Sequence, residues 1–342
     1  MKTIDLRSDT VTKPNKEMLD AMMLAPVGDD VFAEDPTVIK LEKMIAEQAE
    51  KEAGLFFPSG TQANLASLMS HCERGDEYIV GQTAHTYLWE GGGAAVLGSI
   101  QPQPLDFEKD GSLCLEKVGR AIKPIDDHLA RTKLLCLENT TNGKVLPLSY
   151  LEQVRHFCKE KVLKLHLDGA RVFNAAVQLN VELNKISHGF DSISICFSKG
   201  LGAPMGSALC GRKEFIQHAR RWRKVLGGGM RQAGIMAAAC IYALENNVAR
   251  LKNDHANAQF LNQSLETISE IEVEPGSLHT NMLFIKVPTQ YKELHLYLQQ
   301  KGIKLPAQPN KLGLIRLVTH LDVNKDDISV VIGEIKNFYN RH

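Results

Sequence analysis

The feature that most constrains the fold is an alternation of short apolar segments and longer amphipathic segments between residues 55 and 211. The short segments predict strands at 55–57, 77–81, 133–138, 163–168, 191–198 and 207–211. The longer segments predict helices at 61–72, 115–122, 148–160 and 172–180. Strands that alternate with helices favour a mostly parallel sheet with helices on both faces. We therefore predict the α/β class, with ligands bound at the carboxyl ends of the strands.

The segments on either side of this alternation extend the prediction. A polar arm at 4–12 precedes a helix that has Pro14 in its first turn. Asp35 and Pro36 are typical of the start of a second helix, which we expect to close near Gly54. The pattern changes near residue 247, so we predict a large domain at 1–248, which includes the arm, and a smaller α+β domain at 249–342. In the smaller domain we expect strands at 271–273, 281–287 and 313–318, and helices to about 268, at 291–300 and from 326.

Composition excludes several classes of function. The 342 residues carry 40 basic and 40 acidic side chains, so no global charge attracts the chain to nucleic acid or to a membrane. The seven cysteines are scattered without a C-x-x-C pair, which argues against a zinc site or a disulfide framework and favours a reducing compartment. No apolar run approaches the ~18 residues of a membrane span. The first residues also lack the apolar core of a signal peptide, so we expect a cytoplasmic protein. We predict no metal ligands.

Two strand ends carry the residues of a specific chemistry. The strand at 191–198 ends on Ser198 and Lys199 and runs into a Gly-x-Gly turn, where burial would lower the pKa of the lysine and free its amine to attack a carbonyl. A solvated loop lysine is the more common reading of such a motif. Asp168 ends the strand at 163–168, and its presence favours the reactive lysine over the solvated one. An aspartate at the carboxyl end of one strand and a lysine at that of another match the needs of pyridoxal phosphate: the aspartate keeps its pyridine nitrogen protonated, and the lysine binds its aldehyde.

A second motif offers a phosphate site. The strand at 55–57 passes through Ser59, Gly60 and Thr61 into a helix, and such a helix start presents unpaired backbone N–H groups and hydroxyls. Ser59 or Thr61 could equally cap the helix without binding any ligand. Together with Lys199 and Asp168, the phosphate cup is the better interpretation.

Three further residues have two readings each. His85 follows a strand end in a Gly-rich loop and could stack on a flat cofactor ring and handle protons, although a lone histidine is usually a satisfied polar residue. His128 lies in a connecting loop and is a weaker candidate. Arg316 shares a strand face with apolar residues and needs an anion, either a substrate carboxylate or the partner in a structural salt bridge.

Seven short motifs, in order along the chain, carry a family resemblance. They are DLRSDTVT at 5–12, PVGDDV at 26–31, SGTQAN at 59–64, LDGAR at 167–171, SKGLG at 198–202, GGGMRQ at 227–232 and RLVTH at 316–320. With these motifs the chain resembles the low-specificity L-threonine aldolases over essentially its whole length. The resemblance implies a pyridoxal-phosphate enzyme of the aspartate-aminotransferase fold type, with a seven-stranded sheet. Such enzymes are dimers of dimers with sites at the dimer interface, and they cleave β-hydroxy-α-amino acids to glycine and an aldehyde.

The resemblance also implies roles for individual residues. Lys199 would hold the cofactor, Asp168 its ring nitrogen and His85 one face of its ring. The remaining cofactor contacts would come from Ser59, Gly60, Thr61, Arg171, Ser198 and, from a neighbouring subunit, Lys224 and Arg231. Ser8, Arg171 and Arg316 would hold the substrate carboxylate, and His128 would lie near the β-substituent. Thr141 is a departure, because related chains often read ENTHNG here, and it leaves the preference between threonine epimers open.

Two rival functions stay open at this point. A β-eliminating lyase or an aminotransferase would keep Lys199, Asp168 and Arg316 but would need a different residue than His85 on the cofactor face. A non-catalytic nucleotide- or cofactor-binding module is the rival from another class. No G-x-G-x-x-G follows the first strand, which argues against a dinucleotide.

Overall fold

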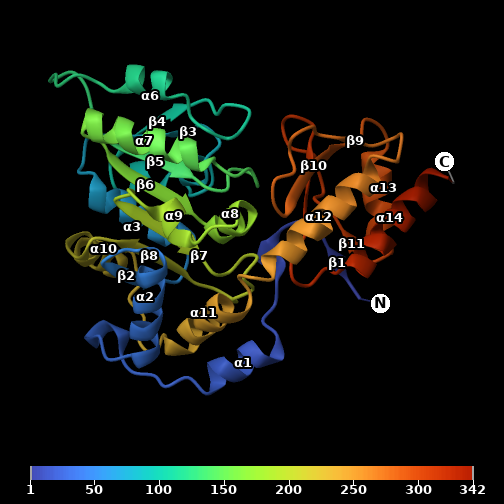
Figure 1. Ribbon diagram of the computed structural model, residues 1–342, viewed down its shortest axis with the longest axis horizontal. Coiled ribbons are helices and arrows are strands. Elements are labelled where there is room, and N and C mark those ends of the chain that lie inside the picture. The colour runs from blue at the N-terminus through green and yellow to red at the C-terminus, as the bar shows by residue number, and fades with distance from the viewer. Residues whose placement is uncertain (1, 341–342) are drawn as a thin grey trace.

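A seven-stranded sheet forms the centre of the larger of two units in the computed structural model, which describes residues 2–340 (Figure 1). Its strands, in the spatial order β2-β8-β7-β6-β5-β3-β4, are β2 (Ala53–Phe57), β8 (Ser207–Gly211), β7 (Ser192–Cys196), β6 (Lys164–Gly169), β5 (Arg131–Glu138), β3 (Asp76–Gly81) and β4 (Gln101–Leu105). Only β8 runs against the others, since it pairs antiparallel with both β2 and β7. The prediction of a mostly parallel α/β sheet is therefore confirmed.

The edge strand β4 was not predicted from the sequence. It reads Gln-Pro-Gln-Pro-Leu, and neither Pro102 nor Pro104 has a backbone N–H to donate. At an edge, one side of the strand needs no ladder hydrogen bonds, so prolines are tolerated there. Parallel pairing with β3 alone holds β4 in place.

Helices cover both faces of the sheet, and the alternation of side chains along each strand explains how. In β2, Phe56 belongs to the largest apolar core, whereas Leu55 and Phe57 belong to a core on the other face. The helices that pack on the larger core include α1 (Lys16–Met23), α2 (Pro36–Gln48), α7 (Leu148–Lys161), α8 (Val172–Leu179), α9 (Leu183–Ser187) and α11 (Gly234–Asn246). The other face is covered mainly by α3 (Gly60–His71) and α10 (Lys213–Val225). The smaller helices α4 (His85–Leu88), α5 (Gly93–Val96) and α6 (Leu115–Ala121) lie towards the β3–β4 edge.

The start of α2 was predicted correctly and its end was not. Asp35 accepts hydrogen bonds from the backbone N–H groups of Thr37 and Val38, and Pro36 occupies the first turn. The helix ends at Gln48 instead of near Gly54. Gly54 lies inside β2, where a Cβ would stand 2.5 Å from the carbonyl oxygen of Glu42. The glycine therefore allows strand and helix to approach closely.

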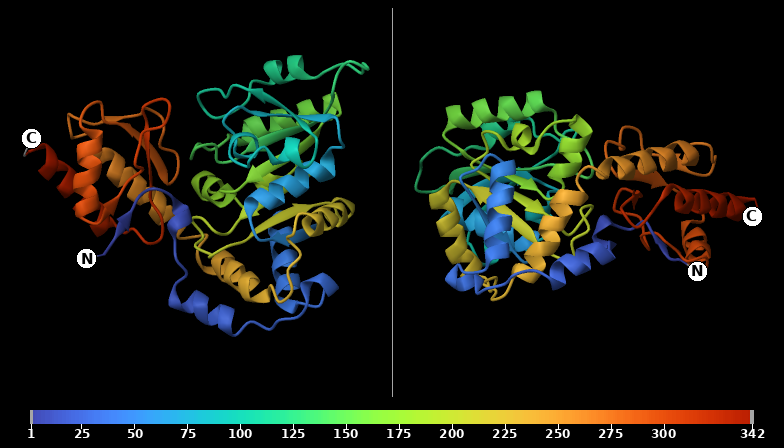
Figure 2. Two further views of the ribbon diagram at one scale, coloured as in Figure 1. Left: turned by 180° about the vertical axis from the view of Figure 1, so that it is seen from behind. Right: turned by 60° about the horizontal axis from the view of Figure 1, so that its bottom comes forward.

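The C-terminal segment forms a second unit around its own apolar core (Figure 2). It contains α12 (Leu251–Leu265), β9 (Glu272–Val273), β10 (Met282–Lys286), α13 (Tyr291–Gln300), β11 (Ile303–Lys304), β12 (Ile315–Val318) and α14 (Lys325–Tyr339). The strand β1 (Ile4–Asp5) pairs with β11, and both Ile4 and Leu6 are buried in this core. The arm that the sequence analysis assigned to the large domain thus packs on the C-terminal unit. The domain boundary at residue 248 stays a prediction.

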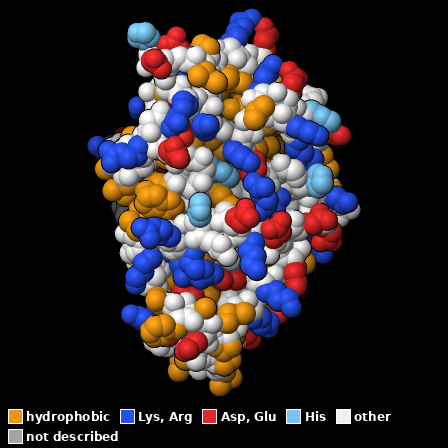
Figure 3. Space-filling model, turned by 90° about the vertical axis from the view of Figure 1, so that its left-hand side faces the viewer, with side chains coloured by type: hydrophobic (Ala, Val, Ile, Leu, Met, Phe, Trp, Pro, Cys, Tyr) orange, Lys and Arg blue, Asp and Glu red, His pale blue; other side chains and the backbone are white. Residues whose placement is uncertain are grey.

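The surface carries mixed charge. On the face displayed in Figure 3, lysine and arginine side chains are interspersed with acidic ones. Among residues 2–340, no helix combines the length and the apolar character that a membrane crossing requires.

Candidate active site

The carboxyl ends of β5, β6 and β7 bring the candidate residues together. Glu138 in β5 lies opposite Asp168 in β6, and Asp168 lies opposite Ser194 in β7. Beyond these ends is a cavity of about 380 Å³, lined by Ser8, Thr10, Thr83, His85, Trp89, Glu138, Asn142, Arg171, Lys199, Met282 and Arg316. Five of these side chains, from five separate segments of the chain, are residues that the sequence analysis selected.

Lys199 lies in the connection that follows β7. Its Nζ is 3.5 Å from the Sγ of Cys196, the last residue of that strand. A Cβ on Gly60 would stand 2.6 Å from the same sulfur, so the start of α3 and the Lys199 amine share a neighbour. The backbone carbonyl of Lys199 accepts a hydrogen bond from the Thr12 hydroxyl at 3.1 Å, which ties the lysine segment to the arm.

Asp168 and His85 are joined by two side chains that the sequence analysis did not select, Asn64 and Glu90. The Asn64 amide donates to Asp168 Oδ2 at 2.9 Å and to Glu90 Oε1 at 2.8 Å. The same Glu90 oxygen is 2.8 Å from Nδ1 of His85. Ligand atoms of His85, Glu90 and Asp168 lie within 4.8 Å of one another, but these hydrogen bonds account for the arrangement and we assign no metal.

The carboxylates around His85 change its proton affinity. The hydrogen bond to Glu90 raises the pKa of His85, and the nearby Asp168 charge adds to the effect. Burial raises the pKa of Glu90, although its hydrogen bond to His85 opposes this. The imidazole therefore holds its Nδ1 proton towards Glu90 and is cationic over a wider pH range than a free histidine.

Two guanidinium groups line the opposite part of the cavity. Arg171 forms a bidentate pair with the buried Asp9, with Nε–Oδ2 and Nη2–Oδ1 distances of 2.8 and 2.6 Å. Burial alone would raise the pKa of Asp9, but Arg171 holds it at about 2. Arg316 donates to the carbonyl oxygen of Arg7 at 3.3 Å and forms no ion pair with any carboxylate of residues 2–340. Burial and the neighbouring Arg171 charge lower the pKa of Arg316, so an anion between the two guanidiniums would be stabilised.

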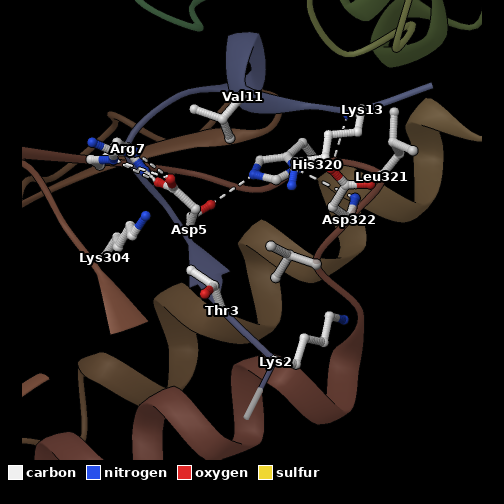
Figure 4. Close-up of a pocket in the computed structure, with 11 residues that line it drawn as sticks. Lys2, Thr3, Asp5, Arg7, Val11, Lys13, Lys304, His320, Leu321 and Asp322 are labelled. Atoms are coloured by element: carbon white, nitrogen blue, oxygen red, sulfur yellow. Dashed lines mark hydrogen bonds and ion pairs between the residues drawn. The ribbon is translucent and has the colours of Figure 1, made fainter. Parts of the chain in front are cut away.

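The arm that carries Ser8 is held by contacts with the C-terminal unit (Figure 4). His320 Nε2 lies 2.7 Å from the carbonyl oxygen of Asp5, and Arg7 binds the Asp5 carboxylate. The backbone N–H of Lys13 donates to Asp322 at 3.2 Å. These groups line a larger cavity of about 700 Å³, which includes Asp5 and Lys304 at the ends of β1 and β11, and the hydrogen bonds in its wall hold the arm in place. We therefore assign this cavity a role in positioning the arm.

The remaining selected residues lie outside the 380 Å³ cavity. His128 is exposed, with 92% of its side chain accessible, and pairs with Asp126. Lys224 is exposed near the end of α10, and Arg231 forms an ion pair with Asp29 at 2.9 Å. Ser59 caps α3 by accepting from the backbone N–H of Gln62, so its cap reading is confirmed whether or not it also binds phosphate. Thr141 is buried and donates to the carbonyl oxygen of Glu138, and it does not line the cavity.

Four residues of the site were missed by sequence reasoning: Asp9, Asn64, Glu90 and Glu138. Asn64 and Asp168 are 104 positions apart, and Arg171 and Asp9 are 162 apart, so no local pattern reports these contacts. The usable signals were the position of Glu138 at a predicted strand end and the places of Asp9 and Asn64 within two of the family motifs.

The residues present fit pyridoxal phosphate. Asp168 is a buried carboxylate that accepts hydrogen bonds from the Ala170 backbone and from Asn64, and it forms no ion pair within residues 2–340, which suits a protonated ring nitrogen. Gly60 begins a twelve-residue helix at a point where a side chain would meet Cys196. The first N–H groups of that helix suit a phosphate, and the Lys199 amine lies close by.

Comparisons with known proteins agree with this geometry. The family described as beta-eliminating lyase matches residues 5–288. The low specificity L-threonine aldolase of Escherichia coli (strain K12) is 55% identical over 339 residues, which cover 99% of this chain and 100% of that protein. A structure of the threonine aldolase of Leishmania major matches with a TM-score of 0.83 at 23% identity, covering 98% of this chain and 99% of the other. A structure of SPT with PLP matches with a TM-score of 0.75 at 15% identity, covering 98% of this chain and 87% of the other. The last two show a shared fold, and the first two show that the chain belongs to the beta-eliminating lyase family and, within it, to the low-specificity L-threonine aldolases.

Proposed function

We propose that this protein is a lyase that binds pyridoxal phosphate and cleaves L-threonine and L-allo-threonine to glycine and acetaldehyde. The observation that carries the proposal is that Lys199, Arg171, Arg316 and His85 line one and the same cavity. The identity to curated L-threonine aldolases over the full chain supports the same reaction.

The two arginines would select the bond that breaks. Arg316 has no carboxylate partner of its own, and Arg171 keeps one donor nitrogen beyond its pair with Asp9, so a substrate carboxylate can bind between them. Ser8 can donate from the arm to the same carboxylate. Holding this group would fix rotation about the α-carbon and so select which of its bonds is aligned for cleavage. Bound pyridoxal phosphate supplies the sink for the electron pair that this bond releases.

The other residues would hold the cofactor. Lys199 binds its aldehyde, Asp168 keeps its ring nitrogen protonated, and Asn64 holds the Asp168 carboxylate in position. Ser59, Gly60, Thr61 and Ser198 surround its phosphate, and His85 lies against its ring. His128 can approach a β-substituent only after its loop moves or in the site of a neighbouring subunit.

The assembly we propose is a homotetramer, a dimer of dimers with sites at the dimer interface. Lys224 and Arg231 are exposed cations outside their own cavity, which suits a role in a neighbouring site. We place the protein in the reducing cytoplasm, since its seven cysteines are all free thiols.

A substrate panel tests the proposal. Purified protein should be yellow, and L-threonine and L-allo-threonine should release glycine faster than L-serine or L-alanine releases pyruvate. Lys199→Ala should stay folded yet lose the yellow colour and nearly all turnover. Borohydride reduction that fixes the cofactor to another lysine would contradict the role of Lys199, and faster pyruvate release would favour the β-eliminating or transaminating rival.

A further inference from the structure

Glu138 is the one carboxylate of the cavity wall to which the proposed mechanism gives no role. It ends β5 beside Asp168, and its Oε2 accepts the backbone N–H of His85 at 2.7 Å. Its Oε1 has no hydrogen-bond partner among residues 2–340, and the side chain is partly accessible because it lines the cavity. One carboxylate oxygen is therefore anchored, and the other is free to meet a bound molecule.

The surroundings of Glu138 suit proton exchange near neutral pH. Burial, and then the Asp168 charge, raise the pKa of Glu138 to about 7, against the opposing effect of the His85 N–H and of the His85 and Lys199 charges. A carboxyl group with such a pKa can take up and release a proton at physiological pH. The titratable and charged groups around it are Cys136 on its own strand, Asp168 on β6, His85 on α4, Arg171 before α8 and Lys199 after β7.

His85, the other candidate base, is less well suited. Its Nδ1 is committed to Glu90, and this hydrogen bond raises the pKa of the imidazole. This hydrogen bond orients the imidazole, so we assign His85 to packing on the cofactor ring and consider Glu138 Oε1 as the proton acceptor.

We propose that Glu138 is a further catalytic residue, whose Oε1 accepts the β-hydroxyl proton of the substrate during cleavage. This inference rests on the proposed function. The O–H bond breaks and its proton moves to Oε1, while the oxygen's electron pair forms the carbonyl of the aldehyde. The Cα–Cβ pair stays with the α-carbon, which later takes up a proton to give glycine. Glu138 returns its proton to water, so no net proton is consumed.

Glu138→Gln tests the proposal, because the amide oxygen can still accept the His85 N–H while the titration is lost. We expect kcat for L-threonine to fall by about 10²–10⁴-fold, with cofactor affinity unchanged. The change in kcat/KM near pH 7 that we expect from titration of Glu138 in the wild type should be absent from the pH profile of Glu138→Gln. In Glu138→Ala, added formate should restore part of kcat by supplying a carboxylate, whereas formate should have no effect on Glu138→Gln, where the amide fills the space.

The outcomes separate this inference from the proposed function. Wild-type protein that releases no glycine from L-threonine would overturn the proposed function, and this inference with it. An active wild type with a Glu138→Gln variant that keeps its kcat and its pH limb would overturn only the role of Glu138. A variant that loses cofactor binding, or shifts only the pH dependence of cofactor absorbance, would also overturn it, since Glu138 would then be a positioning residue.

Discussion

Three carboxylates, Asp168, Glu90 and Glu138, lie around one imidazole, and their roles differ because their partners differ. Asp168 is buried and accepts from a backbone N–H and from the Asn64 amide. Glu90 is buried against His85, and Glu138 keeps one oxygen open to the cavity. Burial, and then the Asp168 charge, raise the pKa values of Glu90 and Glu138. We propose that the three carboxylates divide the tasks of charge stabilisation, orientation and proton exchange.

Replacing Asp168 should lower the rate of catalysis more than it lowers the affinity for the cofactor. Asp168→Asn keeps the shape and the Asn64 contact but removes the negative charge beside the ring nitrogen. Because that charge matters most as electrons accumulate on the cofactor, kcat should fall by about 10²–10³-fold with less than tenfold loss of cofactor affinity. Spectroscopic titration of the cofactor and steady-state kinetics would measure both. An unchanged kcat would exclude this role.

At His85 we predict a similar separation. His85 lines the cavity, but Lys199 is the proposed anchor of the cofactor, so His85→Ala should reduce cleavage of L-threonine more than it reduces cofactor binding. His128→Ala should have a smaller, substrate-dependent effect, because His128 is outside the cavity of its own chain. Measuring kcat and cofactor affinity in both variants tests this order of effects. A larger loss of kcat in His128→Ala than in His85→Ala would contradict the proposed roles of the two histidines.

Asp254 gives a prediction for stability. It is fully buried, it pairs with Arg250, and its Oδ2 has no hydrogen-bond partner. Burial raises the pKa of Asp254 from 3.8 to about 7. The folded state therefore holds a proton that the unfolded chain releases, so this contribution to stability is complete below about pH 4 and is lost as the pH rises through 7.

Urea unfolding between pH 5 and pH 8 measures this contribution. In the wild type, the free energy of unfolding should carry a downward slope with rising pH from Asp254, and Asp254→Asn should flatten that slope. Asp326→Asn, at an exposed carboxylate, is the control and should leave the slope unchanged. An identical pH dependence in Asp254→Asn and wild type would rule out a raised pKa at this position.

At the scale of elements, the arm links substrate binding to the C-terminal unit. Residues 4–6 pair with β11 and pack in the C-terminal core, and Ser8 follows directly into the cavity. Arg316 on β12 donates to the arm's backbone at Arg7. The positions of Ser8 and Arg316, the residues that we propose bind the substrate carboxylate, thus depend on the same packing, whereas the positions of Lys199 and Asp168 depend on the central sheet.

Loosening the arm should therefore weaken substrate binding alone. His320→Ala removes the hydrogen bond to the Asp5 carbonyl and the link to Asp322. We expect KM for L-threonine to rise about tenfold, corresponding to the loss of a hydrogen bond of about 1.4 kcal/mol, with cofactor affinity unchanged. His156→Ala, at an exposed histidine of α7, is the control. An unchanged KM in His320→Ala would show that the arm is held without this bond.

The elements also show where sequence reasoning succeeds. The strands at 55–57, 133–138 and 207–211 were found because an apolar run between turn residues is a local signal, and the start of α2 because a cap is also local. β4 was missed because its prolines and glutamines oppose the strand reading, and only pairing with β3 defines it. The contacts Asn64–Asp168 and Arg171–Asp9 depend on tertiary folding. The reactive side chains at the strand ends could be predicted from the sequence, whereas the hydrogen bonds that orient these side chains and shift their pKa values could not.

At the scale of the whole molecule, the exposed cations Lys224 and Arg231 predict sites that two subunits share. In a two-fold dimer each site would combine Lys199 of one subunit with Arg231 of the other. Mixing inactive Lys199→Ala with inactive Arg231→Ala subunits should therefore restore about a quarter of wild-type activity, since random pairing gives half heterodimers with one intact site each. Lys199→Ala mixed with itself is the control. An active monomer would contradict this prediction.

The central claim is that the cavity around Lys199 directs bond breaking to Cα–Cβ, and L-threonine itself reports this choice. Cleavage of that bond gives glycine and acetaldehyde in equal amounts, whereas β-elimination from the same substrate gives 2-oxobutanoate and ammonia. We predict that purified protein with pyridoxal phosphate converts L-threonine to glycine and acetaldehyde in a one-to-one ratio, and that Lys199→Ala does neither reaction. Formation of 2-oxobutanoate and ammonia as the main products would contradict the account.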